Sequence, residues 1–326
     1  MRRFLPVISA SCLALVVTAY VTAPEKLQNN ASAVSLPEVD AEQWLMQREA
    51  AVHRRTPITP DTEKRIRWAD PEERGITGIA IVYIHGFSAT RQEIAPLPEV
   101  VAGRLGANLF ETRLSGHGLQ TQALAGVSAE DWLADAREAL AVGAAIGRRI
   151  VVIATSTGAT LVLAMSGREE MRKVTAIVMI SPNFSPRDTN AAKLIWPGGL
   201  QIARLALGDT RTWTPHNDDQ ARFWSTSYPT AALVEMMRLV QYTNELLPLS
   251  LEADLLTLYS PADAVVDPEA TLAALKKIAA PRSEIVEIRD SDDPAKHVLV
   301  GDILSPRSTQ PAADRIVTFL GLTSSD

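Results

Sequence analysis

Residues 150–159 read Ile-Val-Val-Ile-Ala-Thr-Ser-Thr-Gly-Ala, a pattern from which much of the fold can be inferred. The apolar run at its start is typical of a strand buried on both faces, and an apolar helix is expected to follow the turn. Ser156 then stands at the tip of a strand–turn–helix connection, where a nucleophilic hydroxyl is lifted out of the sheet. Ala154 and Gly158 are small enough to let strand and helix approach, although Gly is usual at the first position. The other interpretation is an ordinary turn rich in Ser and Thr.

Similar short apolar runs recur on both sides of this stretch. Helices are expected between them: Ser128 opens one with a capping-box pattern, and Asp267 followed by Pro268 opens another that reaches about Ile278. Alternation of apolar strands with helices indicates a mostly parallel sheet covered on both faces, so the predicted fold class is α/β. The predicted strands lie at 79–84, 107–110, 150–153, 176–180, 255–259 and 285–288.

The alternation fails between residues 184 and 253, where no clear strand is visible and a helical insertion is expected. About a tenth of this segment is aromatic, against 5% of the whole chain. One interpretation is an insertion that packs its own small core. The other is a cap over a cleft, in which some aromatic side chains and Met236-Met237 line an apolar pocket. The aromatic residues are Phe184, Trp196, Trp213, Phe223, Trp224, Tyr228 and Tyr242.

Two backbone N–H groups are candidates for stabilising a negatively charged oxygen during acyl transfer. His85-Gly86-Phe87 directly follows the strand at 79–84, and a turn containing Gly can direct N–H groups into a cleft. The donors would be the N–H of Phe87 and that of Thr157, the residue after Ser156. The His85 side chain is expected to orient this loop, and not to act as a catalytic base.

The candidate acid and base follow later strands. Asp263 lies just past a predicted strand and has no evident structural role, whereas Asp267 has a sufficient one as a helix N-cap. His297 lies in the loop after the last predicted strand. Ser156, Asp263 and His297 therefore each follow a successive strand, which predicts a nucleophile–acid–base triad. The remaining histidines have no matching context: His53, His117 and His216.

These motifs together resemble the α/β-hydrolase superfamily, and within it the branch of bacterial carboxylesterases, monoacylglycerol lipases and serine-aminopeptidase-like hydrolases. The resemblance covers about residues 79–320. It implies Ser156, Asp263 and His297 as catalytic residues, an oxyanion hole formed by the N–H groups of Phe87 and Thr157, and an acyl-enzyme mechanism without a cofactor. Besides the Ser156 turn it rests on His85-Gly86-Phe87-Ser88, Arg113-Leu114-Ser115-Gly116-His117-Gly118, Glu130-Asp131-Trp132, Ser260-Pro261-Ala262-Asp263 and His297-Val298.

The expected function is that of a serine hydrolase acting on a small-molecule carboxylic ester. Cleavage of an amide or a carbon–carbon bond, or acyl transfer to an alcohol, would use the same triad, and a non-catalytic binding module is the alternative from another class. The single cysteine, Cys12, excludes a disulfide framework, and five histidines without ligand spacing argue against a metal site. A net charge of −6 with no basic run argues against a nucleic-acid partner.

The N-terminal segment is expected to direct export. Arg2 and Arg3 precede residues 4–23, which are 20 residues without a charge, a length between a signal-peptide core and a membrane span. A signal peptide cleaved after Ala19 and a retained membrane anchor both remain open. In either case the rest of the chain is expected outside the cytoplasm, anchored to the inner membrane facing the periplasm or secreted into it. The expected organisation continues with a polar tether at 24–60 that carries an amphipathic helix around 43–53, a hydrolase core at 61–183 and 254–326, and the cap at 184–253.

Overall fold

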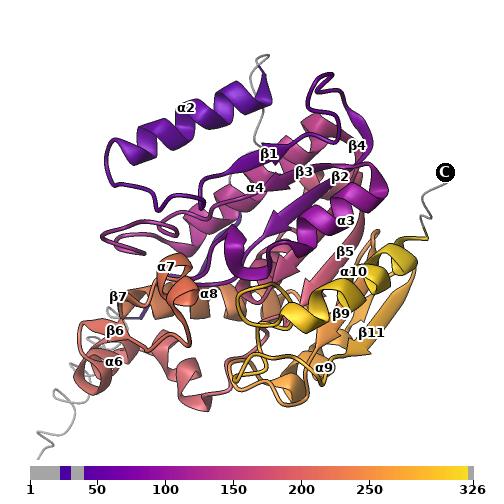
Figure 1. Cartoon of the computed structure of the whole chain (residues 1–326). Helices are drawn as coiled ribbons and strands as arrows, with labels where there is room; N and C mark the ends of the chain where they lie inside the picture. Colours follow the sequence, from indigo (N-terminus) through magenta and orange to yellow (C-terminus); the bar gives the residue numbers. More distant parts are fainter. Residues whose placement is uncertain (1–22, 31–39, 322–326) are drawn as a thin grey trace, which may run out of the picture.

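The computed structural model describes residues 23–30 and 40–321, and its centre is a seven-stranded sheet (Figure 1). In the order β1-β3-β2-β4-β5-β9-β11, neighbouring strands are parallel except β1, which pairs antiparallel with β3 at one edge. All six predicted strands are present, which confirms the mostly parallel α/β fold. The sequence does not predict β1, because Arg-Ile-Arg contains no apolar run. The strands are β1 Arg65–Arg67, β2 Thr77–Ile84, β3 Asn108–Glu111, β4 Gly147–Thr155, β5 Val174–Ile180, β9 Asp254–Tyr259 and β11 Ser283–Glu287.

Each face of the sheet buries its own apolar cluster. In β2, Ala80, Val82 and Ile84 belong to one cluster, and the alternate residues Ile79, Ile81 and Tyr83 belong to the other. This alternation follows from the strand geometry, which turns successive side chains to opposite faces. Helices therefore cover both faces, as predicted. The first face is covered by α4 (Ala129–Ile146), α5 (Thr157–Ala164) and α9 (Pro268–Leu275), and the second by α3 (Leu97–Leu105) and α10 (Pro306–Leu320).

Two helices begin where the sequence predicts. Ser128 is the N-cap of α4, and it exchanges hydrogen bonds with Asp131 in a capping box. Asp267 is the N-cap of α9, where its Oδ1 accepts a hydrogen bond from the N–H of Glu269 at 3.0 Å. α9 ends earlier than predicted, because Ile278 belongs to the short strand β10 (Ile278–Ala279), which pairs with β8 (Leu249–Ser250).

The insertion between β5 and β9 is mainly helical but also contains a small sheet, which the sequence does not predict. Its strands β6 (Thr210–Thr212) and β7 (Ser227–Pro229) pair antiparallel. The longest helix of the insertion, α8 (Ala231–Glu245), packs on α5, and its buried side chains belong to the same apolar cluster as one face of the main sheet. The insertion is thus attached to the core through a shared apolar interior. Its other elements are η3 (Thr189–Ile195), α6 (Gly199–Leu207) and α7 (Asp218–Phe223).

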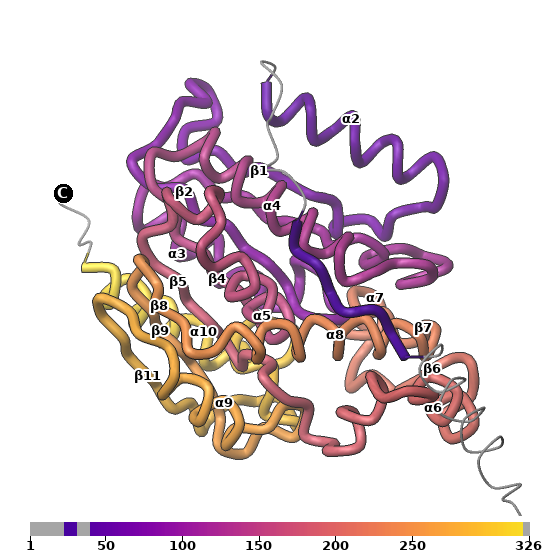
Figure 2. Tube along the Cα trace, turned by 180° about the vertical axis from the view of Figure 1, so that it is seen from behind, coloured from indigo at the N-terminus to yellow at the C-terminus, as the bar shows by residue number. Residues whose placement is uncertain are grey.

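The described residues at the N-terminal side lie against the core and differ from the expected tether. Residues 23–30 cross α8 (Figure 2), and Leu27 and Asn29 are buried. The Asn29 side chain donates a hydrogen bond to the carbonyl oxygen of Ala164 at 2.9 Å, which helps to hold this segment against the core. The predicted signal or anchor at 1–22 and part of the tether, 31–39, lie outside the described residues. Among the helices that are described, none is long and apolar enough to span a membrane.

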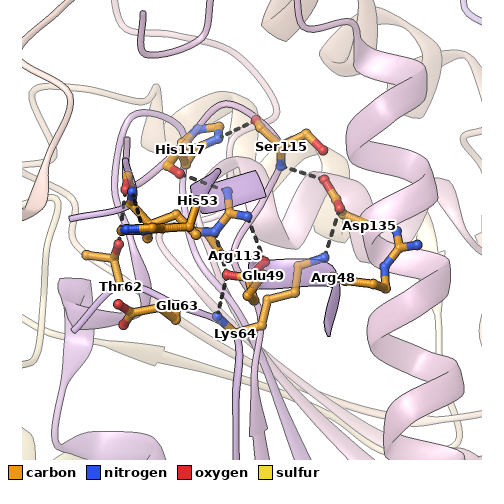
Figure 3. Close-up of polar contacts among 12 residues, drawn as sticks. Arg48, Glu49, His53, Thr62, Glu63, Lys64, Arg113, Ser115, His117 and Asp135 are labelled. Carbon is orange, nitrogen blue, oxygen red and sulfur yellow. Dashed lines mark hydrogen bonds and ion pairs between the residues drawn. The ribbon is translucent and has the colours of Figure 1, made fainter. Parts of the chain in front are cut away.

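A helix is present at the predicted place as α2 (Ala41–His53), but it is not amphipathic, because its two buried residues are Leu45 and the charged Glu49 (Figure 3). Glu49 accepts hydrogen bonds from the Arg113 guanidinium at 2.7 and 2.8 Å and from the backbone N–H of Lys64 at 3.0 Å. The Lys64 ammonium in turn pairs with Asp135 and Glu138 of α4. This network links α2 to the core through charges that are largely removed from water.

Candidate active site

Ser156 occupies the sharp turn between β4 and α5. Its backbone has φ 50° and ψ −117°, a conformation that residues other than glycine rarely adopt. Two bonds hold it there: the N–H of Ser156 donates to the carbonyl of Ile180 at 2.9 Å, and the carbonyl of Ser156 accepts from the N–H of Asn183 at 3.2 Å. A Cβ on residue 158 would lie 2.3 Å from the carbonyl oxygen of Ile84, so glycine is required at Gly158. The turn has the strained geometry that its sequence predicts.

Asp263 and His297 are in direct contact. Nδ1 of His297 lies 2.8 Å from Oδ2 of Asp263, and both side chains are almost fully buried. The other carboxylate oxygen of Asp263 accepts hydrogen bonds from the N–H groups of Val265 and Val266 at 2.8 and 2.9 Å, which fix its orientation. Asp267 instead caps α9. Of the two candidate acids, Asp263 is therefore the one that the structure brings to His297.

Two residues that sequence reasoning did not single out hold the loop that carries His297. Asp293 is 2% exposed, and its Oδ2 accepts hydrogen bonds from the N–H groups of His297 and Val298 at 2.9 and 2.8 Å. The Ser181 hydroxyl donates to the carbonyl oxygen of His297 at 2.6 Å. Each of these bonds joins a side chain to a backbone group, which sequence patterns rarely reveal. The spacing Asp-x-x-x-His is the one feature of the sequence that indicates the contact between Asp293 and the His297 backbone.

The acids around His297 favour its charged form. Burial by itself lowers the pKa of His297, but Asp263 opposes this effect, and Glu93 and Asp293 add to the opposition, so the pKa of His297 lies above its ordinary value. Burial raises the pKa of Glu93, against the lowering effects of its hydrogen bond from Gly86 and of the nearby His297. The imidazolium that forms when a histidine accepts a proton is thus stabilised at this place.

Ser156 and His297 line one cavity of about 350 Å³, a size that fits a small ligand. Within residues 23–30 and 40–321, no hydrogen bond joins the Ser156 hydroxyl to the His297 ring. Nδ1 of the ring is taken by Asp263, so Nε2 is the nitrogen that can accept a proton from a group in the cavity. Catalytic hydrogen bonds often tighten only when substrate binds.

The N–H groups of Phe87 and Thr157 are available at the same cavity. Both residues line it, and neither N–H donates to another described residue. Thr157 is the first residue of α5, where a helix has no internal acceptor for the N–H. Two donors beside a serine nucleophile can bind the oxyanion of an acyl-transfer intermediate.

Buried side chains fix the loop that carries Phe87. Nε2 of His85 accepts from the N–H of Leu114 at 3.1 Å, and its Nδ1 lies 2.8 Å from the carbonyl oxygen of Gly86. His85 is fully buried and does not line the cavity, which confirms the structural role predicted for its side chain.

Glu93, in the short helix η1 (Arg91–Ile94), is another residue that sequence reasoning missed. Its Oε2 accepts hydrogen bonds from the N–H of Gly86 at 2.8 Å and from the Tyr83 hydroxyl at 3.0 Å. Glu93 also lines the cavity. No motif marks it, because it acts seven residues along the chain from the glycine that it holds.

The sequence model of the alpha/beta hydrolase family matches residues 81–311, which is more than half of the chain. The chain belongs to this family. Similar solved structures include one from work on LipS and LipT, two metagenome-derived lipolytic enzymes, with 19% identity and a TM-score of 0.66 over 81% of this chain and 99% of that one. The monoacylglycerol lipase of Paleococcus ferrophilus is 14% identical with a TM-score of 0.58, over 79% and 97%. A soluble variant of the Saccharomyces cerevisiae monoglyceride lipase is 10% identical with a TM-score of 0.55, over 91% and 99%. No curated protein matches the chain in sequence.

In this member of the family, the insertion at 184–253 forms part of the cavity wall. The N–H of Ser225 donates to the carbonyl oxygen of Ser88 at 2.7 Å, which ties the insertion to the loop after Phe87. The Tyr228 ring packs edge-on against Phe87, with ring centroids 5.3 Å apart. The insertion residues that line the cavity are Pro186, Arg211, Trp213, His216, Gln220, Trp224, Tyr228 and Met236.

Both interpretations of the aromatic residues in the insertion hold in part. Trp213, Trp224 and Tyr228 line the cavity, as a cap would require. Phe184 and Phe223 are buried elsewhere in the apolar interior, and Met237 lines a different groove from Met236.

As for metal binding, no three His, Cys, Asp or Glu side chains in the described part of the chain gather in a way that could hold an ion.

Proposed function

We propose that the chain is a serine hydrolase that cleaves carboxylic esters through an acyl-enzyme. The observation that carries this proposal is the convergence on one cavity of Ser156 in its strained turn and of His297 bonded to Asp263. Membership of the alpha/beta hydrolase family supports hydrolysis. Structural neighbours named as lipases support an ester as the substrate.

In the first step, Nε2 of His297 takes the hydroxyl proton as Oγ of Ser156 attacks the ester carbonyl carbon. The carbonyl electron pair moves to the oxygen, which the N–H groups of Phe87 and Thr157 bind as an oxyanion. Asp263 stays ionised, holds the imidazole tautomer and stabilises the imidazolium.

Collapse of this tetrahedral intermediate re-forms the carbonyl and breaks the bond to the leaving oxygen, and His297 gives its proton to the departing alcohol. Water, which then loses a proton to His297, attacks the acyl-enzyme. The second collapse releases the carboxylic acid and returns the proton to Ser156.

The cavity supports an ester with an apolar acyl or aromatic group. Trp213, Trp224, Tyr228 and Met236 form much of the wall that the insertion supplies. An apolar pocket distinguishes neighbouring chain lengths by only about 1–3 kcal/mol per methylene, so a graded preference is expected.

Hydrolysis of p-nitrophenyl esters of increasing chain length tests the proposal. The wild type should hydrolyse them, and Ser156→Ala should lose the activity while its far-UV circular dichroism stays unchanged. Ser115→Ala is the matched control, because the Ser115 side chain makes no hydrogen bond that the mechanism uses. Retained hydrolysis in Ser156→Ala would refute the role of Ser156.

We also propose that residues 1–23 bring the chain to the extracytoplasmic side of the membrane. The support is the pair Arg2-Arg3 before 20 uncharged residues. In a bacterial host, the full chain should be digested by protease added to spheroplasts. In undigested protein, the intact mass should correspond either to a chain that retains this segment or to a chain cleaved near Ala19. Full-length protein in the cytosolic fraction would contradict the proposal.

A further inference from the structure

Exposed large apolar side chains are concentrated at one place in the described structure. In all the described residues, eight large apolar side chains are exposed, and four of them fall between residues 196 and 207. These four, Trp196, Ile202, Leu205 and Leu207, are called the α6 face below. Leu205 is 90% exposed, and Trp196 and Ile202 are 58% and 62% exposed. Isolated exposed apolar residues are ordinary, but a group of them marks a binding surface.

The helix α6 carries three of its four large apolar side chains, Ile202, Leu205 and Leu207, on the outside. Its two buried residues, Gly199 and Ala203, are both small. Ile202 and Leu205 are three positions apart and therefore share one side of the helix, which faces away from the core. A surface helix of a soluble domain usually turns its apolar stripe inward. None of the residues in 23–30 and 40–321 covers this stripe.

The N-terminal segment joins the described structure beside the α6 face. Pro24 and Leu27 line one groove together with Ile195, which directly precedes Trp196. The backbone carbonyl of Glu25 accepts a hydrogen bond from Arg238 of α8 at 2.8 Å, which fixes this point. Figure 2 shows that the described segment starts at residue 23 near the corner that holds α6, β6 and β7 and crosses α8 from there.

This connection points to a lipid partner. The 20 uncharged residues before Pro24 have the composition of a membrane segment, and they join the folded part next to the α6 face. A segment held in a bilayer would bring that face to the same membrane surface. A protein partner has no comparable support in the chain.

We propose that the α6 face docks onto a lipid bilayer, with Trp196 at the headgroup level and Ile202 and Leu205 at the boundary of the acyl chains. Arg204, the one charged residue within α6, pairs with Asp209 at 3.2 Å. The docking therefore depends on burial of apolar side chains and should occur on phosphatidylcholine, which has no net charge. The inference does not require that the chain hydrolyses esters.

A fluorophore placed on the α6 face of the full chain tests the inference. Leu205→Cys in a Cys12→Ser background is labelled with nitrobenzoxadiazole, and the protein is reconstituted into phosphatidylcholine vesicles. The matched control is Ile76→Cys in the same background. Ile76 is 62% exposed and precedes β2, at the opposite end of the sheet from Ser156.

Vesicles with a nitroxide on the lipid acyl chains should quench the label at position 205 roughly twofold or more, and the label at position 76 hardly at all. Adding Ile202→Ser should reduce the quenching at position 205. Equal, weak quenching at both positions in vesicle-bound protein would overturn the inference. That result would mean that the N-terminal segment alone binds lipid, or that this segment or a second copy of the chain covers the α6 face.

Discussion

At the scale of single residues, Asp263 and Asp267 lie four positions apart and make different contacts. Asp263 is buried against His297, whereas Asp267 stands at the start of α9, where its side chain satisfies the N–H of Glu269. The first arrangement orients an imidazole, and the second stabilises a helix end. Substitutions at the two positions should therefore change different properties.

We expect Asp263→Asn to lower kcat by several orders of magnitude, about 10⁴ in the best-studied triad, because the tautomer of His297 is no longer held. Asp267→Ala should keep most of the activity and lower the free energy of unfolding by about 1 kcal/mol, through the loss of the cap. Ester hydrolysis and urea unfolding of both variants check this. The reverse assignment of effects would exclude Asp263 as the triad acid.

The pH dependence of kcat/KM should report His297. This residue must be neutral to accept the serine proton, and the surrounding acids raise its pKa above the ordinary value of about 6.5. The rate should therefore fall with decreasing pH through a midpoint above that value. In Asp263→Asn the effect of burial is no longer opposed by the carboxylate, so the midpoint should move to lower pH. A wild-type midpoint at or below the ordinary value, or one that Asp263→Asn leaves in place, would contradict the account.

Glu93 should act as a positioning residue for the Phe87 loop. Glu93→Ala removes the acceptor of the Gly86 N–H, and a displaced oxyanion donor should lower kcat by roughly 10²-fold with a smaller effect on KM. Glu93→Gln keeps a carbonyl oxygen that can accept the same bonds, and it should restore most of the rate. The kinetics of the two variants, compared at one pH, provide the check. If the Gln variant were as slow as the Ala variant, the charge of Glu93 and not its hydrogen bonds would be responsible.

At the scale of elements, the insertion should set the chain-length preference. Trp213→Ala or Trp224→Ala should shift the preferred p-nitrophenyl ester, because both side chains line the cavity. The phosphonylation rate with a small probe should change little. Trp196→Ala is the control, since Trp196 belongs to the insertion but not to the cavity wall. An unchanged profile in both cavity variants would mean that these aromatics only pack the insertion.

The attachment of α2 should depend on its buried ion pair. Glu49→Ala leaves the Arg113 guanidinium, which is 4% exposed, without its carboxylate, and breaking a buried pair costs about 3–5 kcal/mol. The matched control is Arg74→Ala, which breaks the exposed pair of Arg74 with Glu42 and should cost at most about 1 kcal/mol. Urea unfolding measures both. Similar losses in the two variants would show that the Glu49 pair does not stabilise the fold.

At the scale of the whole molecule, the sequence is sufficient to predict the parallel sheet and the positions of Ser156, Asp263 and His297. Apolar runs identify buried strands, and the residues that end parallel strands gather at one edge of the sheet. Sequence reasoning misses Glu93 and Asp293, because each acts through hydrogen bonds to backbone groups that only the folded loops bring near.

The surface of the molecule is harder to predict from the sequence, for a different reason. The strands β1, β6 and β7 are three residues long and carry no apolar run that would reveal them. Residues 23–30 read as polar chain, yet Leu27 and Asn29 are buried against the core. Such contacts depend on the shape of the core surface against which the segment packs. The local pattern of residues in the sequence does not encode that shape.

The central claim is that Ser156 is the nucleophile of this hydrolase-family chain, and the most direct measurement is the site at which a fluorophosphonate attaches. Peptide mass spectrometry of the labelled wild type should place one adduct on Ser156, and Ser156→Ala should take up no label while remaining folded. An adduct on Ser181 or Ser115, or undiminished labelling of the variant, would contradict the claim.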